Sequence, residues 1–283
     1  MTKKFHVCKL CNHYDVILGM GEVGITLFNL LTERNFKCIG IDIDKSKCKN
    51  MEESTNNVKY LHVCFPGQLD TFDEDVIESI NKLNPECVII HSTVKPGTTK
   101  RIQEKTTIPI LFSPIRGVHR RFLDDIKRYT KFISFDHTEI NTEIKKDLEN
   151  RFKKVEWMST TKTAELAKIL VDTSYYGWLI NYAQITKMIC EKENIDFDEM
   201  WKFADEIHEN LGNRPKMFPG IIGGHCVIPN LNLIEHENID LIREINQKFI
   251  NNNSSSNKIH CKICDKDYIE TCFMHYAIKD SWE

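Results

Sequence analysis

A glycine-rich loop between two apolar segments constrains the fold of this chain more than any other feature. It reads GMGEVG, and it directly follows DVIL and directly precedes ITLFNLLTE. In a strand–loop–helix unit, Gly19 makes the turn, Gly21 lets the backbone approach a pyrophosphate, and Gly24 lets the helix pack against the strand. The helix N-terminus, where Glu22 and Val23 lie, then faces the phosphates. The loop is therefore predicted to bind a dinucleotide.

An acidic residue after the next apolar segment indicates which dinucleotide binds. Asp42 ends KCIGID, eighteen residues beyond Gly24. A carboxylate at this place accepts a hydrogen bond from the adenosine ribose and repels a 2′-phosphate. The sequence therefore favours NAD as the cofactor, although Lys45 and Lys47 nearby leave NADP open.

The apolar pattern divides the chain into two domains. Short apolar runs alternate with amphipathic segments from Asp15 to about Phe135, which predicts an α/β fold with a Rossmann-type, doubly wound parallel sheet. From Thr163 apolar residues recur every three or four positions, which predicts an all-helical domain, and the segment PGIIGGHCVIPN within it is expected to be an ordered loop. The expected parts are an N-terminal cysteine-rich extension (1–13), the dinucleotide-binding domain (14–158), the helical domain (159–250), and a linker with a cysteine-rich tail (251–283).

Composition limits the classes of partner and compartment. The chain has 283 residues, of which 41% are hydrophobic, so it can bury a core without disulfides. A net charge of −3 gives no basic surface for nucleic acid, and no apolar run is long enough to span a membrane. Eleven cysteines follow a start, MTKKFHVCKL, that has no secretory apolar core. We therefore expect a cytoplasmic protein with mostly reduced thiols.

Five segments, in order along the chain, resemble one known family. Besides the glycine loop they are VCFP (63–66), HSTVKPGTT (91–99), AELAK (164–168) and GGHC (223–226). Together they resemble the UDP-glucose/GDP-mannose dehydrogenase family of nucleotide-sugar 6-dehydrogenases, with a UDP-N-acetylmannosamine dehydrogenase-like character.

The resemblance implies an activity and a set of roles. Members of the family oxidise the C6 alcohol of a nucleotide sugar twice, with two NAD molecules, through a cysteine-bound thiohemiacetal and thioester. By position Cys226 is the nucleophile and Lys168 the ammonium that stabilises the oxyanion. The resemblance also places Pro66, Ser92 and Thr93 beside the cofactor, and Arg214, Gly223 and Gly224 beside the sugar.

Some positions depart from the family pattern. Asp172 stands where the family has an asparagine and Asn230 where it has an aspartate, so we expect Asp172 to orient or deprotonate a water or hydroxyl. Ile115 replaces a glutamate that assists thioester hydrolysis. About fifty residues follow Asn230, too few for the family's third, nucleotide-binding domain.

These departures leave two alternatives open. One is a catalytically retired NAD-binding or assembly subunit. The other is a β-hydroxyacid dehydrogenase-like enzyme that makes no use of the loop cysteine.

The helical run from Thr163 to about Glu193 predicts the oligomeric state. It carries more apolar residues than one small domain covers, and the family dimerises through this element. A homodimer is therefore expected.

The cysteines at the two ends resemble metal ligands. Each CxxC pair places two thiolates on one side of a tight turn, so two pairs form a Cys₄ zinc site if the termini meet. A local CxxC and CxxH set in the tail is the alternative. The first arrangement uses Cys8, Cys11, Cys261 and Cys264, and the second uses Cys261, Cys264, Cys272 and His275.

Overall fold

The computed structural model divides the chain into two compact units, at residues 1–166 and 167–283. The boundary lies inside a helix, slightly beyond the expected one at 158/159. The described residues are 13–51, 57–117, 121–136, 141–213, 215, 217, 219–223 and 227–252, with the backbone of 259–261 and 266–268.

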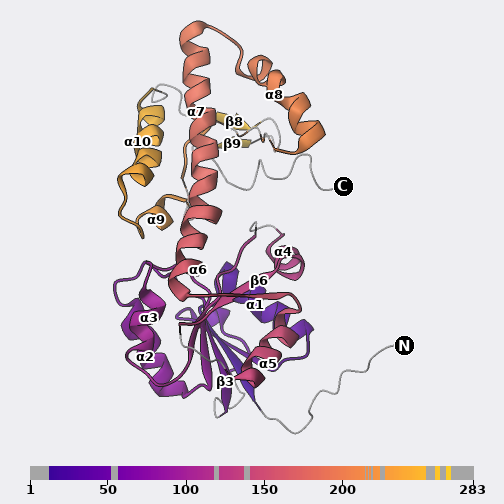
Figure 1. Ribbon diagram of the computed structural model, residues 1–283, viewed down its shortest axis with the longest axis vertical. Helices are drawn as coiled ribbons and strands as arrows, with labels where there is room; N and C mark the ends of the chain where they lie inside the picture. The colour runs from indigo at the N-terminus through magenta and orange to yellow at the C-terminus, as the bar shows by residue number, and fades with distance from the viewer. Residues whose placement is uncertain are drawn as a thin grey trace, which may run out of the picture. The chain divides into compact units, whose positions relative to one another are not determined.

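The first unit is built on a seven-stranded sheet (Figure 1). Its strands are β1 (Tyr14–Leu18), β2 (Cys38–Ile41), β3 (Val58–Val63), β4 (Cys87–Ile90), β5 (Ile110–Phe112), β6 (Lys131–Ser134) and β7 (Val155–Met158), in the order β2-β1-β3-β4-β5-β6-β7. The first five are parallel, whereas β6 pairs antiparallel with β5 and parallel with β7. The predicted α/β fold is confirmed, with a sheet that is mostly rather than wholly parallel.

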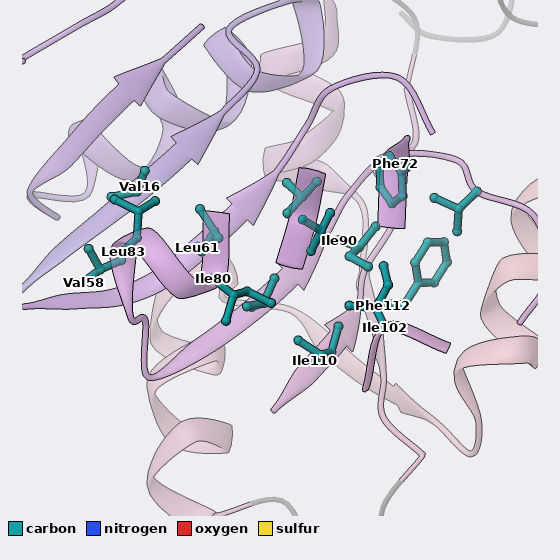
Figure 2. Close-up of a cluster of buried hydrophobic side chains, with 14 of the residues drawn as sticks. Val16, Val58, Leu61, Phe72, Ile80, Leu83, Ile90, Ile102, Ile110 and Phe112 are labelled. Carbon is teal, nitrogen blue, oxygen red and sulfur yellow. The ribbon is translucent and has the colours of Figure 1, made fainter. Parts of the chain in front are cut away.

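Helices cover both faces of this sheet. On one face α2 (Phe72–Leu83) and α3 (Thr98–Gln103) pack on strand residues such as Val16 and Ile90 (Figure 2). The other face is covered by α1 (Glu22–Glu33), α4 (Phe122–Arg128) and α5 (Thr142–Phe152), which pack on Ile17 and Ile89. Because successive strand residues point to opposite faces, apolar runs such as CVII serve both cores.

The second unit is helical, as predicted. It begins at the last residue of α6 (Thr161–Ala167), and the helix continues through the π-helical segment η3 (Lys168–Ser174) into α7 (Tyr175–Glu193). The helices α8 (Phe197–Leu211), α9 (Val227–Leu231) and α10 (Glu237–Asn252) follow. In this unit α10 packs along α7 (Figure 1). A short 3₁₀ turn, η1 (Lys45–Lys47), lies in the first unit, and β8 (Ile259–Cys261) pairs with β9 (Lys266–Tyr268). None of the helices in the described part of the chain is long and apolar enough to cross a membrane.

The expectation of a loop throughout PGIIGGHCVIPN is wrong at its end, where α9 begins at Val227. Val227 and Leu231 are buried, and their packing stabilises a helical turn that the local composition does not favour. Pro229 lies in the first turn, where a missing N–H breaks no intrahelical bond.

A line of buried polar side chains crosses the sheet face that α5 covers. Asp15 on β1 forms a two-point ion pair with Arg151 from α5, at 2.9 and 3.2 Å. His62 on β3 lies next, with Nε2 3.7 Å from Asp15 Oδ2 and Nδ1 2.9 Å from Nε2 of His91, which follows β4. Strands β1 and β3 and the residue after β4 therefore each contribute one titratable group to a buried row.

Burial and neighbouring charges set the protonation states of this row. Burial alone would raise the pKa of Asp15, but His62 and Arg151 outweigh it and hold the pKa below its usual value. Burial lowers the pKa of His62, and it lowers that of His91 further, with help from the Lys131 ammonium. The carboxylate is therefore charged and both imidazoles are neutral near pH 7.

We predict that the unfolding free energy falls as the pH drops below about 6.5, where histidine is protonated in the unfolded chain. The folded state resists protonation of His62 and His91, so each contributes a slope of up to about 1.4 kcal/mol per pH unit. Urea unfolding at several pH values should show a smaller decline for His62→Gln than for the wild type. His236→Gln, at an exposed position, is the control. An equal decline in all three proteins contradicts the prediction.

Candidate active site

The carboxyl ends of the first four strands meet at one edge of the sheet. Backbone hydrogen bonds join them: Gly19 N donates to Ile41 O at 2.8 Å, and Cys64 N donates to Leu18 O at 2.8 Å. In open α/β sheets, ligands bind at this edge where the strand order reverses, which here is between β1 and β3. All the residues predicted to bind the cofactor lie at this edge: Gly19, Gly21, Glu22, Val23, Gly24, Asp42, Pro66, Ser92 and Thr93.

A side chain would meet different surroundings at each of the three glycines of the loop. Gly19 has a φ of +90°, and a Cβ there would lie 2.6 Å from Phe65 N. A Cβ on Gly24 would lie 1.9 Å from the Gly19 carbonyl oxygen, so the helix could not pack as it does. A Cβ on Gly21 would meet no described atom within 4 Å. Two glycines are thus required by the fold, and the third leaves open backbone at the start of α1.

The Asp42 carboxylate supports the glycine loop. Its Oδ2 accepts from Met20 N at 2.6 Å and its Oδ1 from Asp44 N at 2.9 Å. Each carboxylate oxygen can accept about two hydrogen bonds, so both retain acceptor capacity for a ribose hydroxyl. Ile43, beside Asp42, is fully exposed and offers apolar surface next to that carboxylate. Its local sequence signal is a single apolar residue between two aspartates, Asp42 and Asp44.

A buried glutamate ties α6 to the turn that follows β4. Glu165 is fully buried and accepts from Gly97 N at 2.5 Å, from Thr99 N at 2.9 Å and from Thr99 Oγ1 at 2.7 Å. At the same edge Ser92 Oγ donates to Phe65 O at 2.5 Å. The motif AELAK predicted a helix at Glu165. Its contact with Thr99 could not be predicted from local sequence, because the two residues are 66 positions apart.

The π-helical segment η3 holds an ion pair. Lys168 Nζ lies 2.5 Å from Asp172 Oδ2, with the lysine side chain 14% exposed. Thr173 Oγ1 donates to the Lys168 carbonyl at 3.1 Å. In this unit α9, which contains the buried Asn230, packs against η3. The structure thus joins Lys168 to Asp172 and packs the helix that carries Asn230 on the same segment. Single π-helical turns occur frequently at functional sites.

Several predicted site residues lie outside the described part of the chain. Gly223 is described and partly buried. The others are Cys226, Gly224 and Arg214 of the proposed substrate site, and Cys8, Cys11, Cys264, Cys272 and His275 of the proposed zinc site, while Cys261 is described only by its backbone. Within the described residues no group of three or more His, Cys, Asp or Glu could hold a metal ion. A structural zinc ion stays a prediction from the sequence.

The five cysteines with described side chains are free thiols. Cys38, Cys87 and Cys190 are buried, and Cys48 and Cys64 partly so. Burial raises the pKa of Cys38 and of Cys64 to about 12, so these thiols are protonated and poorly nucleophilic.

Ile115, where the family has an acid, is 4% exposed and packs in the core beneath α1 and α4. An apolar residue therefore fits this position well.

Known proteins resemble the chain in part of its sequence and in its fold. Residues 16–99 match the family model described as the TrkA-N domain. The chain is 25% identical over 255 residues to UDP-N-acetyl-D-mannosamine dehydrogenase of Methanocaldococcus jannaschii, across 75% of this chain and 58% of that protein. It therefore spans less than two thirds of the length of this curated relative.

Two solved structures show the similarity in fold. UDP-D-ManNAc dehydrogenase from Pyrococcus horikoshii has a TM-score of 0.70 at 16% identity and is matched over 86% of this chain and 70% of that one. The 3-hydroxyisobutyrate dehydrogenase of Mycobacterium tuberculosis has a TM-score of 0.61 at 12% identity, over 84% of this chain and 94% of that one. The predicted resemblance to nucleotide-sugar dehydrogenases is thus confirmed.

Proposed function

We propose that this chain is an NAD-dependent oxidoreductase that acts on the CH–OH group of a nucleotide sugar, with Cys226 as its nucleophile. The main support for the proposal is the geometry at the carboxyl edge of the sheet. There the backbone of Gly21 is open, and the Asp42 carboxylate accepts a hydrogen bond from Met20 N in the same loop. The similarity to UDP-N-acetyl-D-mannosamine dehydrogenases supports a nucleotide sugar as the substrate.

The residues at the sheet edge fit NAD. The start of α1 and the backbone of Gly21 would hold the pyrophosphate, and Asp42 would accept from the adenosine ribose. Ile43 would contact the adenine through its exposed side chain. NAD, when bound, supplies the hydride acceptor.

The residues of the second unit would carry the carbon chemistry. The Cys226 thiolate adds to the aldehyde carbon, the carbonyl electron pair moves to oxygen, and the Lys168 ammonium stabilises that oxyanion. Asp172 Oδ2 lies 2.5 Å from Lys168 Nζ, so the two side chains form an ion pair. We propose that the Asp172 carboxylate also orients or deprotonates the water or hydroxyl that an aspartate at the position of Asn230 would have handled.

A second function is favoured by one observation. The 3-hydroxyisobutyrate dehydrogenase of M. tuberculosis is matched over 94% of its length, so the similarity in fold covers nearly all of that enzyme. A β-hydroxyacid dehydrogenase-like enzyme would use Lys168 without Cys226. A retired NAD-binding subunit is the remaining alternative.

Replacement of the nucleophile separates these functions. We predict that Cys226→Ser lowers turnover by about a thousandfold or more, because a hydroxyl is a far weaker nucleophile at neutral pH. Cys190→Ala, at a buried thiol, is the control and should keep turnover close to that of the wild type. The measurement is NADH formation across a panel of UDP- and GDP-sugars, with product mass to separate aldehyde from acid.

Two outcomes of that assay oppose the proposal. Retained turnover in Cys226→Ser would favour the β-hydroxyacid type. A wild-type protein that binds NAD but oxidises no sugar would favour the retired subunit.

Cofactor binding can be removed without disturbing the fold. A valine at Gly21 would project into open space and Gly21 has an ordinary φ of −72°, so we predict that Gly21→Val leaves the melting temperature of the NAD-free protein unchanged. It should weaken NAD binding by about 100-fold or more, since the side chain occupies the place of the pyrophosphate. Titration calorimetry measures the affinity. If Gly21→Val binds NAD as tightly as the wild type, the dinucleotide binds elsewhere.

We also propose a homodimer that forms through η3 and α7. Large apolar and aromatic side chains are exposed along one stripe of these segments, and Tyr182 within it is 59% exposed. The stripe consists of Val171, Tyr175, Trp178, Tyr182 and Ile189. Their spacing of four, three, four and seven residues places them on one helix face, and such a face is typical of a protein interface.

We predict that Tyr182→Lys shifts the protein from dimer to monomer in sedimentation velocity, because a buried ammonium at the centre of the stripe would be desolvated. Lys192→Glu, an exposed polar change near the end of α7, should leave the dimer intact. A wild-type protein that sediments as a monomer at micromolar concentration refutes the homodimer.

A further inference from the structure

The chain that follows β2 folds back on that strand and encloses Asp42 in a short loop. Gly40 and Lys49 pair as an antiparallel bridge, with Gly40 N 3.0 Å from Lys49 O and Lys49 N 2.9 Å from Gly40 O. Asn50 Nδ2 donates to the carbonyl of Cys38 at 2.9 Å, so the returning chain is bonded to β2 at a second place. We call residues 42–48 the return loop.

The Cys48 thiol bonds both backbone groups of Asp42 across the return loop. Asp42 N donates to Cys48 Sγ at 3.4 Å, and Cys48 Sγ donates to Asp42 O at 3.4 Å. A thiol offers a donor and an acceptor, and this pairing uses both. The thiol is half-buried and also lies 4.0 Å from the carbonyl oxygen of Asp44. Cys48 therefore restrains the backbone at Asp42 as a neighbouring strand would.

The carboxylate of Asp42 is restrained as well. Its two oxygens accept from Met20 N at 2.6 Å and from Asp44 N at 2.9 Å. Asp44 is fixed in turn, because its own carboxylate accepts from Ser46 N at 3.0 Å and from Ser46 Oγ at 2.7 Å. Hydrogen bonds thus hold both the backbone and the side chain of Asp42.

The restraint on Asp42 affects the choice between the two dinucleotides. A carboxylate that cannot turn away repels a 2′-phosphate, whereas one that can turn away leaves room for it. Lys45 and Lys47 on the return loop are exposed, and their ammonium groups would attract a 2′-phosphate that found such room. A preference for NAD therefore depends on how firmly the return loop holds Asp42.

We infer that Cys48 is a specificity-determining residue that selects NAD over NADP by positioning Asp42. The inference rests on the proposed function, in which the Asp42 carboxylate accepts from the adenosine ribose. Cys48 acts through the backbone of Asp42, so it is a positioning residue. A small apolar side chain would fill the same space but would leave the N–H and the carbonyl of Asp42 without this partner.

The test compares two substitutions of similar size. Cys48→Ser keeps a donor and an acceptor, whereas Cys48→Val has neither. Titration calorimetry measures the affinity of each variant for NAD and for NADP. Because two hydrogen bonds to Asp42 are lost, we expect Cys48→Val to weaken NAD binding by about three- to tenfold and to lower the preference for NAD over NADP by about tenfold. Cys48→Ser should stay within about threefold of the wild type in both measurements.

An NAD analogue that lacks the adenosine 2′-hydroxyl distinguishes positioning from general loosening of the loop. The wild type should bind this analogue more weakly than NAD, and in Cys48→Val the difference should shrink, because the carboxylate no longer meets the hydroxyl. A merely structural role would weaken the binding of both ligands equally. Cys87→Ala, at a fully buried thiol on β4, is the control and should lower the melting temperature without changing either preference.

Asp42→Ala separates this inference from the proposed function. If Asp42→Ala keeps the wild-type preference for NAD over NADP, the proposed role of Asp42 fails and the role of Cys48 fails with it. If Asp42→Ala removes the preference while Cys48→Val retains it, only the role of Cys48 is refuted. Should Cys48→Val not fold, Cys48→Ala, which lacks the same donor and acceptor, takes its place in every comparison.

Discussion

The first unit depends on close backbone contact at the carboxyl edge of its sheet. Gly19 lies against Phe65 at the end of β3, and Gly24 lies against the carbonyl of Gly19, so α1 can begin where β1 ends. No side chain fits at either place. The Asp42 carboxylate bonds the loop from the neighbouring strand and so links loop geometry to the residue proposed to recognise the ribose. The proposed dinucleotide site lies here because the packing that closes the fold also leaves the backbone of Gly21 open.

The helical run of η3 and α7 has the same organising role in the second unit. One side of α7 holds the loop before Cys226 through Gln184 and the segment after it through Gly177. The ion pair of Lys168 and Asp172 lies in η3, and α9 packs on it. These contacts bring Gly220, Val227 and the Lys168–Asp172 ion pair to one helical run.

Local patterns predicted much of this architecture, and contacts between distant segments account for what they missed. The loop of Gly19 and the carboxylate of Asp42 are recognisable because their roles depend on a strand, a turn and a helix that are contiguous in sequence. The pairing of Asp15 with Arg151 spans 136 positions, and that of Gln184 with Asn246 spans 62. Neither follows from periodicity. The short helix α9 was missed because burial of Val227 and Leu231, rather than helix propensity, stabilises it.

The sequence by itself determined the α/β class, the place of the glycine loop, the helical second unit and the family resemblance, because hydrophobic period, glycine spacing and short motifs are properties of contiguous residues. Tertiary structure decided that Glu165 anchors the turn after β4, that two histidines share a buried row with Asp15, and that Gln184 and Asn246 bond the backbone of Gly220 and Ile222. The physical reason is that a polar side chain acquires its role from the partner it meets when both are desolvated, and only the folded chain brings those partners together.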